Sequence, residues 1–481
     1  MPLYCYPAPC APRYKKPTSA DDCLPQARFL VKKKSEHIRL GLGPVKNGDR
    51  VIILTLPDQD KYVAEAVTQT LIEEGAQQVD FLYPEDFGKQ AVKHSVTDGW
   101  KEMEMMDQGI ASGALTDVDL MTGLGLGAAL DKYLDKHQEY TSAFFDIGGA
   151  NTKKAMSKDN ISRFKGFWPF NNWEEYLSEQ WTFPDEVWTE MERQILEPIG
   201  KASKVRITDP EGTDLEFSLT IEEAKRWQLC AGLSGHLLME PLMATVSEVW
   251  KIPKVSPEVP PVFNNINGVL AGCANHCGYF PRIELYFQNG LLVEAIGGGK
   301  YGDDIRNTMQ RYQNLQWPGY PGKGFFWFCD LALCTAVKAF RRKSDRLNSY
   351  WIYPNIAERT RAGIIHLGMG VRRHGKEFDK FVIENKLPTG HVHVHNYFPT
   401  YEVKLHGTDH WHKIVDKGFI TALSNPDLVA LTSGYGDPKK LLSYDWIPPL
   451  PGINCEGNYL QDYAKDPAAY LKKREDQNKP I

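Results

Sequence analysis

The sequence predicts an α/β domain of the doubly wound type in its first half and an α+β domain dominated by antiparallel sheet in its second half. Residues 49–83 have the pattern strand, helix, strand, and residues 205–220 and 283–296 have the pattern of hairpins. Near residue 200 the sequence pattern changes from alternating strands and helices to hairpins. We therefore expect a Rossmann-like α/β domain over residues 1–200, a β-rich domain over 201–445 and a Pro-rich extended tail over 446–481.

The composition excludes several classes of protein. The 481 residues are 42% hydrophobic and carry a net charge of −5, which is typical of a folded globular chain without the basic surface that binds nucleic acid. No apolar run approaches a membrane span, and three prolines interrupt the first residues, so we expect neither membrane insertion nor a signal peptide. Nine sparse cysteines indicate reduced thiols, and we expect a cytoplasmic protein.

The N-terminal half begins with a βαβ unit. A continuous apolar run over 49–56 predicts a buried strand, residues 59–75 predict a helix that ends at Gly75, and residues 78–83 predict the next strand. A unit of this length requires a parallel sheet. The glycines from Gly123 to Gly127 have the spacing G-x-G-x-G, not the dinucleotide-binding G-x-G-x-x-G, and therefore indicate a packing turn.

Two hairpins mark the second half. Residues 205–220 alternate apolar and polar side chains on both sides of a turn, and residues 283–296 do the same around Asn289-Gly290. The cluster from Cys273 to Cys277 lacks a second cysteine pair, so we do not interpret it as a zinc site.

Histidines are concentrated late in the chain, where eight of the thirteen lie between residues 366 and 412. In the segment 391–395, alternation places His391, His393 and His395 on one face of a strand. The segment His410-Trp-His412 repeats this arrangement. Converging imidazoles without acids favour zinc, iron or copper over calcium or magnesium. The alternative is a His-rich surface that binds metals nonspecifically.

The order of several motifs resembles that of the aminopeptidase T superfamily, which also holds the ring-cleaving 2,5-dihydroxypyridine 5,6-dioxygenases. The motifs are Gly48-Asp-Arg-Val-Ile-Ile, Glu74-Gly-Ala, Arg206-Ile-Thr-Asp-Pro-Glu-Gly-Thr-Asp-Leu, Leu285-Tyr-Phe-Gln-Asn-Gly-Leu-Leu-Val and the late Thr408-Asp-His-Trp-His. The resemblance spans most of residues 25 to 425.

The resemblance implies a metal site, with changed ligands. His236 stands where the peptidases have a metal-binding glutamate, and Ile364 stands at a second glutamate position. The positions of the family's histidine and its final His-x-Asp pair correspond to His393 and to His410 and His412. Without bridging carboxylates, a two-metal peptidase centre is not expected. The resemblance therefore implies one metal bound by His393, His410 and His412 in the domain 201–445.

We accordingly expect a non-haem Fe(II) dioxygenase that cleaves an aromatic or heteroaromatic ring, or, as the alternative, a Zn(II) hydrolase acting on a small amide. A third possibility is a metal-binding protein without activity. A neutral three-histidine centre favours an anionic substrate. The resemblance also implies a homo-oligomer. The expected acid/base residues are His236, His366 and Tyr401, and the expected substrate-binding residues are Arg372, His391 and Tyr397.

Overall fold

The computed structural model describes most of the chain. The described residues are 5–32, 45–88, 95, 97, 99–104, 126–145, 164–166, 173–228, 237–240, 262–341, 343, 360–372 and 374–481. Among them, no helix has both the length and the apolar character to cross a membrane.

A four-stranded parallel sheet forms the N-terminal half, in the order β2-β1-β3-β4. Its strands are β1 (Arg50–Leu54), β2 (Gln78–Leu82), β3 (Ser142–Phe145) and β4 (Phe164–Gly166). The expected βαβ unit is present, because α2 (Lys61–Glu73) connects β1 to β2 and packs with α1 (Leu24–Lys32). Asp60 begins α2 by accepting hydrogen bonds from two backbone N–H groups of its first turn. The glycine-rich segment before α5 (Leu126–Lys136) lies largely outside the described residues.

A twelve-stranded, antiparallel sheet dominates the rest of the chain, as the sequence predicts. Its main path runs β13-β12-β11-β10-β9-β8-β6-β5-β14-β15-β16, and β7 pairs with β11 beside that path. The strands are β5 (Ala202–Thr208), β6 (Asp214–Ser218), β7 (Leu237–Glu240), β8 (Asn267–Ala274), β9 (Tyr279–Gln288), β10 (Leu291–Gly297), β11 (Trp327–Cys334), β12 (Ile365–Val371), β13 (Gly390–Asn396), β14 (Thr400–Leu405), β15 (Trp411–Asp416) and β16 (Phe419–Ile420).

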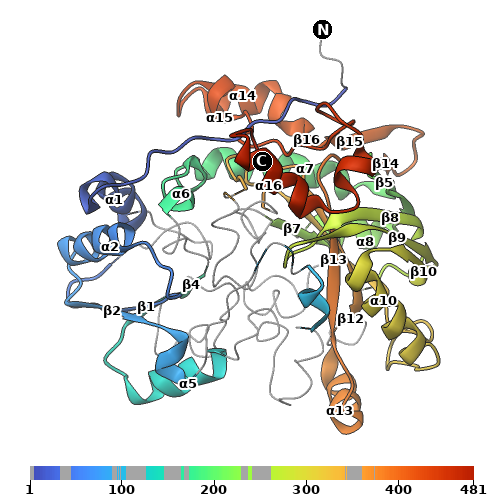
Figure 1. The fold of residues 1–481 in the computed structure, drawn as a ribbon, viewed down its shortest axis with the longest axis horizontal. Coiled ribbons are helices and arrows are strands. Elements are labelled where there is room, and N and C mark those ends of the chain that lie inside the picture. Colours follow the sequence, from blue (N-terminus) through green and yellow to red (C-terminus); the bar gives the residue numbers. More distant parts are fainter. Residues whose placement is uncertain are drawn as a thin grey trace.

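Helices flank these strands at several places. They are α6 (Trp173–Tyr176), α7 (Asp185–Ile199), α8 (Ile221–Trp227), α10 (Gly299–Tyr312), α13 (Gly375–Asn385), α14 (Pro426–Thr432), α15 (Pro438–Leu441) and α16 (Pro467–Asp476). In Figure 1, α10 lies beside β10 and α13 extends beyond the end of β12.

Both hairpins expected from the sequence are formed. Strands β5 and β6 pair from Lys204, which is opposite Ser218, to Thr208, which is opposite Asp214. Strands β9 and β10 are joined at Asn289 and Gly290, with φ values of 49° and 79°. Two consecutive left-handed residues match the right-handed twist of a hairpin, which explains why the sequence has Asn-Gly there.

The large sheet bends so that β13 packs against β8, although four strands separate them in the main path. The side-chain amide of Asn396 donates to the carbonyl of Ala271 at 2.8 Å. Gly272 has no side chain at the crossing, where an added Cβ would lie 2.6 Å from Cγ1 of Val394. The close approach brings the turn that follows β8 near the histidines of β13.

The C-terminal tail differs from the extended segment that we expected, because it contains α16 and a short π-helical turn over Tyr459–Tyr463. Prolines 448, 449 and 451 are followed by residues that again favour helix. Trp446 is fully buried, and its Nε1 donates to the carbonyl of Ile481 at 2.6 Å. The tail is therefore packed on the body of the protein.

Candidate metal centre

One face of strands β12 and β13 carries most of the candidate site. The two strands are antiparallel, with His366 opposite His395, Gly368 opposite His393 and Gly370 opposite His391. The residues that alternate with the histidines, Val392 and Val394, are fully buried among apolar side chains. The expected period-two arrangement of His391, His393 and His395 is thus present, and we call this surface the histidine face.

Glycine at position 368 creates the space in which these side chains meet. It pairs with His393 on one side and with Asp330 of β11 on the other. A Cβ there would lie 2.7 Å from Cβ of Asp330 and 3.2 Å from Cδ2 of His393. Any larger residue would separate the acid from the imidazole.

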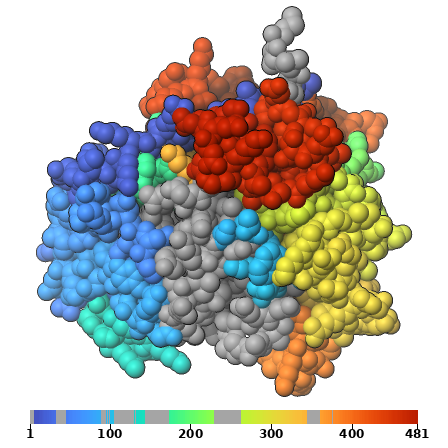
Figure 2. Space-filling model, in the orientation of Figure 1, coloured from blue at the N-terminus to red at the C-terminus, as the bar shows by residue number. Residues whose placement is uncertain are grey.

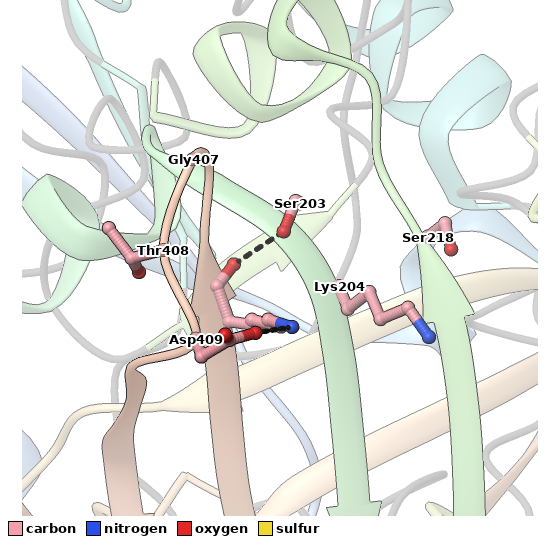
Figure 3. Close-up of a pocket in the computed structure, with 7 residues that line it drawn as sticks. Ser203, Lys204, Ser218, Gly407, Thr408 and Asp409 are labelled. Carbon is pink, nitrogen blue, oxygen red and sulfur yellow. Dashed lines mark hydrogen bonds and ion pairs between the residues drawn. The ribbon is translucent and has the colours of Figure 1, made fainter.

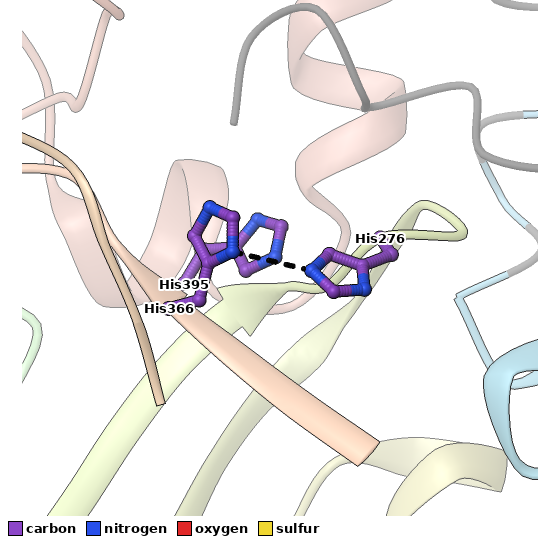
Figure 4. Close-up of side chains that lie close together, drawn as sticks. All are labelled: His276, His366 and His395. Atoms are coloured by element: carbon purple, nitrogen blue, oxygen red, sulfur yellow. Dashed lines mark hydrogen bonds between the residues drawn. The ribbon is translucent and has the colours of Figure 1, made fainter. Parts of the chain in front are cut away.

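Three histidines form the first group of close ligand atoms, and we call it the three-histidine group. It consists of His276, His366 and His395, each offering a nitrogen within 4.8 Å of the other two. All three are at most 4% exposed. Nε2 of His276 lies 3.3 Å from Nδ1 of His366, and the rings of His366 and His395 stack at 4.5 Å (Figure 4).

The outer nitrogens of two of these rings have partners. Nδ1 of His276 lies 3.3 Å from Oε1 of Glu102, and Nε2 of His366 lies 3.1 Å from Sγ of Cys334. Such partners fix the orientation and tautomer of histidines that bind metals. The inner nitrogens of His276 and His366 therefore point toward each other.

The donor set fits a borderline metal ion. Two nitrogens bound at about 2.0–2.1 Å are roughly 2.9–3.4 Å apart at usual coordination angles, and the inner nitrogens of His276 and His366 are 3.3 Å apart. Neutral imidazoles suit zinc, iron and copper.

Carboxylates complete two further groups that share His393. The first joins Glu102, His276 and His393, and the second joins Asp330, His391 and His393. Nδ1 of His393 lies 2.9 Å from Oε1 of Glu102, and its Nε2 lies 3.1 Å from Oδ2 of Asp330. Both ring nitrogens of His393 therefore face carboxylates.

The charges in these groups follow from burial and proximity. Burial and the nearby His393 lower the pKa of His391 to about 3, so its ring is neutral. Burial opposes ionisation of Asp330, but hydrogen bonds with His391 and His393 hold its pKa well below the usual range. Burial also disfavours charge on His393, yet Glu102 and Asp330 outweigh it and raise the pKa of this imidazole.

The structure does not bring His410 and His412 to His393. His410 is exposed just before β15, and His412 is opposite Val403 on β14, near the other end of the strand order. None of the groups of close ligand atoms among the described residues includes either histidine. The predicted set of His393, His410 and His412 is therefore not assembled, because period-two alternation fixes which face of a strand a residue occupies but not which strands are neighbours.

The other expected site residues are distributed as follows. His366 lies in the three-histidine group. His391 lies beside Asp330, and its Nε2 is 3.6 Å from Oδ2 of that residue. Arg372 is buried, and its Nη1 donates to the carbonyl of Cys329 at 2.7 Å. His236 lies outside the described residues.

Tyr397 and Tyr401 are fully buried core residues. The ring of Tyr397 packs near Trp446, and Tyr401 lies on β14 opposite Ile207 and Val415. The hydroxyl of Tyr397 lies 3.5 Å from Nη2 of Arg341. The substrate-binding role of Tyr397 and the acid/base role of Tyr401 stay predictions.

Sequence reasoning missed three residues of these groups. His276 lies inside the Cys273–Cys277 segment, where the sequence pattern draws attention to the cysteines and not to the histidine between them. Asp330 is an acid within the otherwise apolar strand Trp327–Cys334, and a buried acid of this kind was a usable signal. Glu102 comes from a segment without any motif, and only the tertiary structure reveals its role.

A surface cavity of about 410 Å³ lies over β5, β6 and the β14–β15 turn, apart from the histidine face (Figure 3). Its lysines already have acidic partners, since Nζ of Lys204 lies 3.0 Å from Glu216 and Nζ of Lys404 lies 2.7 Å from Asp409. No group of close ligand atoms found in the described part of the chain lies at this cavity, so the candidate centre remains the histidine face.

Comparisons with known proteins give two structural similarities. No family model and no curated protein sequence matches the chain. The fold is similar to 2,5-dihydroxypyridine dioxygenase from Pseudomonas putida KT2440, with 12% identity and a TM-score of 0.37 over 84% of this chain and 99% of that one. It is also similar to AmpT from Thermus thermophilus, with 13% identity and a TM-score of 0.40 over 83% of this chain and 99% of that one. These are the two kinds of enzyme that the order of motifs resembles. We transfer no residue role from either structure.

Proposed function

We propose that the protein is a metal-dependent enzyme with a mononuclear centre bound by the three-histidine group. The observation that carries the proposal is the convergence of buried nitrogens from His276, His366 and His395, two of which have outer partners. A bound divalent metal would polarise a substrate oxygen or bind dioxygen. The three ligands would come from β12, β13 and the β8–β9 turn, so strand pairing sets the site.

Non-haem Fe(II) is the metal that we favour, with a dioxygenase activity that cleaves an aromatic or heteroaromatic ring. Neutral imidazoles leave the charge of the cation uncompensated, which favours an anionic phenolate or carboxylate as substrate. Arg372 supports the same substrate class, because its buried guanidinium lies near Asp330 and its Nη2 has no hydrogen-bond partner among the described residues.

The alternative is a Zn(II) hydrolase acting on a small amide. The observation that favours it is the ionised carboxylate of Asp330, whose Oδ1 has no hydrogen-bond partner among the described residues. Such a carboxylate can accept a proton from attacking water. We rank this function second because Oδ2 of Asp330 already interacts with His393.

Elemental analysis and oxygen uptake test the proposal. The full chain, purified without a His-tag, should bind iron after anaerobic reconstitution and consume oxygen with hydroxylated aromatic acids. His395→Ala should lose the iron, whereas His410→Ala and His412→Ala should retain it as matched histidine controls. Retention of zinc through dialysis with hydrolysis of amides would support the alternative. Equal metal content in the parent and His395→Ala would refute the three-histidine centre.

A further inference from the structure

Glu102 makes four polar contacts beside the three-histidine group, although it comes from the N-terminal half of the chain. Its carboxylate accepts the backbone N–H of His393 at 2.9 Å and the hydroxyl of Tyr301 at 3.3 Å. It also contacts Nδ1 of His393 at 2.9 Å and Nδ1 of His276 at 3.3 Å. The residue is 6% exposed.

The segment that carries Glu102 is fixed against the C-terminal sheet at several points. The side-chain amide of Asn275, in the same turn as His276, donates to the carbonyl of Gly99 at 2.7 Å. A Cβ at Gly99 would lie 2.8 Å from the carbonyl oxygen of Tyr279, so the backbones are in close contact.

A second anchor comes from α10. Nζ of Lys300 lies 3.5 Å from the centre of the Trp100 ring. The hydroxyl of the next residue, Tyr301, lies 3.3 Å from the Glu102 carboxylate and 3.0 Å from the carbonyl oxygen of His393. Figure 2 shows the segment around residue 100 packed against the region of α10. The carboxylate is thereby held rigidly on one side of His276.

A histidine can bind a metal through Nε2 only when that nitrogen carries no proton. A carboxylate at Nδ1 holds the proton on Nδ1 and leaves the lone pair of Nε2 directed at the cation. In His276, Nδ1 contacts Glu102 and Nε2 faces His366. The contact with Glu102 therefore selects the tautomer that the three-histidine group requires.

We propose that Glu102 is a positioning residue for the metal centre, which orients His276 and fixes its tautomer without binding the metal itself. The inference rests on the proposed three-histidine centre. Its consequence is that the N-terminal half contributes to metal affinity through the carboxylate of Glu102, and that the docking of residues 99–104 and metal binding reinforce each other.

Cobalt(II) binding to the full-length protein tests this role, because the visible spectrum of Co(II) reports coordination geometry. We would compare Glu102→Gln and Glu102→Ala with the parent, and use Glu104→Gln as the matched control. Glu104 lies in the same segment, but its side chain is about half exposed, and its ion pair with Nζ of Lys300 is long, at 3.9 Å.

We expect Glu102→Ala to bind one Co(II) at saturation with an affinity lowered by about 10–100-fold and with an altered spectrum. Glu102→Gln should recover part of the loss, because its amide oxygen can still accept the Nδ1 proton. Glu104→Gln should bind as the parent does. The Glu102→Gln comparison remains informative if Glu102→Ala fails to fold.

Two results would overturn the positioning role while leaving the three-histidine centre intact. One is unchanged affinity and spectrum in both Glu102 variants. The other is loss of Co(II) in both variants with no recovery in Glu102→Gln, which would make Glu102 a direct ligand. If the parent bound no Co(II), or if His395→Ala bound it equally well, the proposed function and this inference would fall together.

Discussion

Gly368→Ala should destabilise the protein by inserting one methyl group where three side chains meet. The new Cβ would lie 2.7 Å from Cβ of Asp330, 3.0 Å from Cδ2 of His391 and 3.2 Å from Cδ2 of His393. Asp330 belongs to a central strand and cannot move far, so the strands must separate locally. Overpacking of this kind costs about 1–3 kcal/mol. The substitution also reduces the entropy of the unfolded chain, which offsets about 0.4–1 kcal/mol of that cost.

The matched control is Gly322→Ala, because an added Cβ there meets only the Trp327 ring at 3.4 Å. This substitution should be neutral or stabilising by up to about 1 kcal/mol. Urea unfolding followed by circular dichroism would compare the two variants with the parent. The expected result is a midpoint below that of the parent for Gly368→Ala only. Equal midpoints for the two variants would show that β11, β12 and β13 do not approach as closely as described.

Two further predictions concern buried ionisable residues outside the candidate centre. Burial raises the pKa of Asp209 to about 7 and that of Glu211 to about 8, so the folded protein keeps protons that the unfolded chain has released. The free energy of unfolding should therefore fall as the pH rises from about 4 to about 8. Asp209→Asn should flatten this pH dependence, as measured by urea unfolding. Arg361 is fully buried and donates to the carbonyls of Ala362, Gly418 and Tyr397, so Arg361→Ala should lower the unfolding free energy by at least about 3 kcal/mol, and an unchanged urea midpoint would contradict these bonds.

Local patterns in the sequence were sufficient to predict several parts of the fold. The apolar run at β1, the helical pattern of α2 before Gly75 and the Asn289-Gly290 turn are local signals, and each element forms where it was expected. The common face of His391, His393 and His395 follows from the two-residue repeat of a strand.

The partners of that face could not be predicted in the same way. His276 approaches because β13 crosses β8, and His366 approaches because of the register between β12 and β13. Glu102 is brought in by the docking of residues 99–104. Strand order and register are set by the whole core, so a short H-x-H pattern at His410 and His412 carried no information about them.

The two buried carboxylates of the histidine face bear on the number of metal ions. Glu102 and Asp330 provide the acids that a second ion would need, and the group of Asp330, His391 and His393 shares no residue with the three-histidine group. However, both acids already face His393, through Nδ1 and Nε2, and they raise the pKa of this imidazole, which favours a positive charge between them.

A second divalent ion would have to displace the charge on His393 while lying close to the first ion. We therefore expect one metal per chain at neutral pH, even in excess metal. Titration with Co(II), followed by gel filtration and elemental analysis, would measure this ratio. His391→Ala should leave the ratio at one, because His391 belongs only to the group with Asp330. A ratio of two in the parent that falls to one in His391→Ala would refute the mononuclear centre and show that Asp330, His391 and His393 bind a metal of their own.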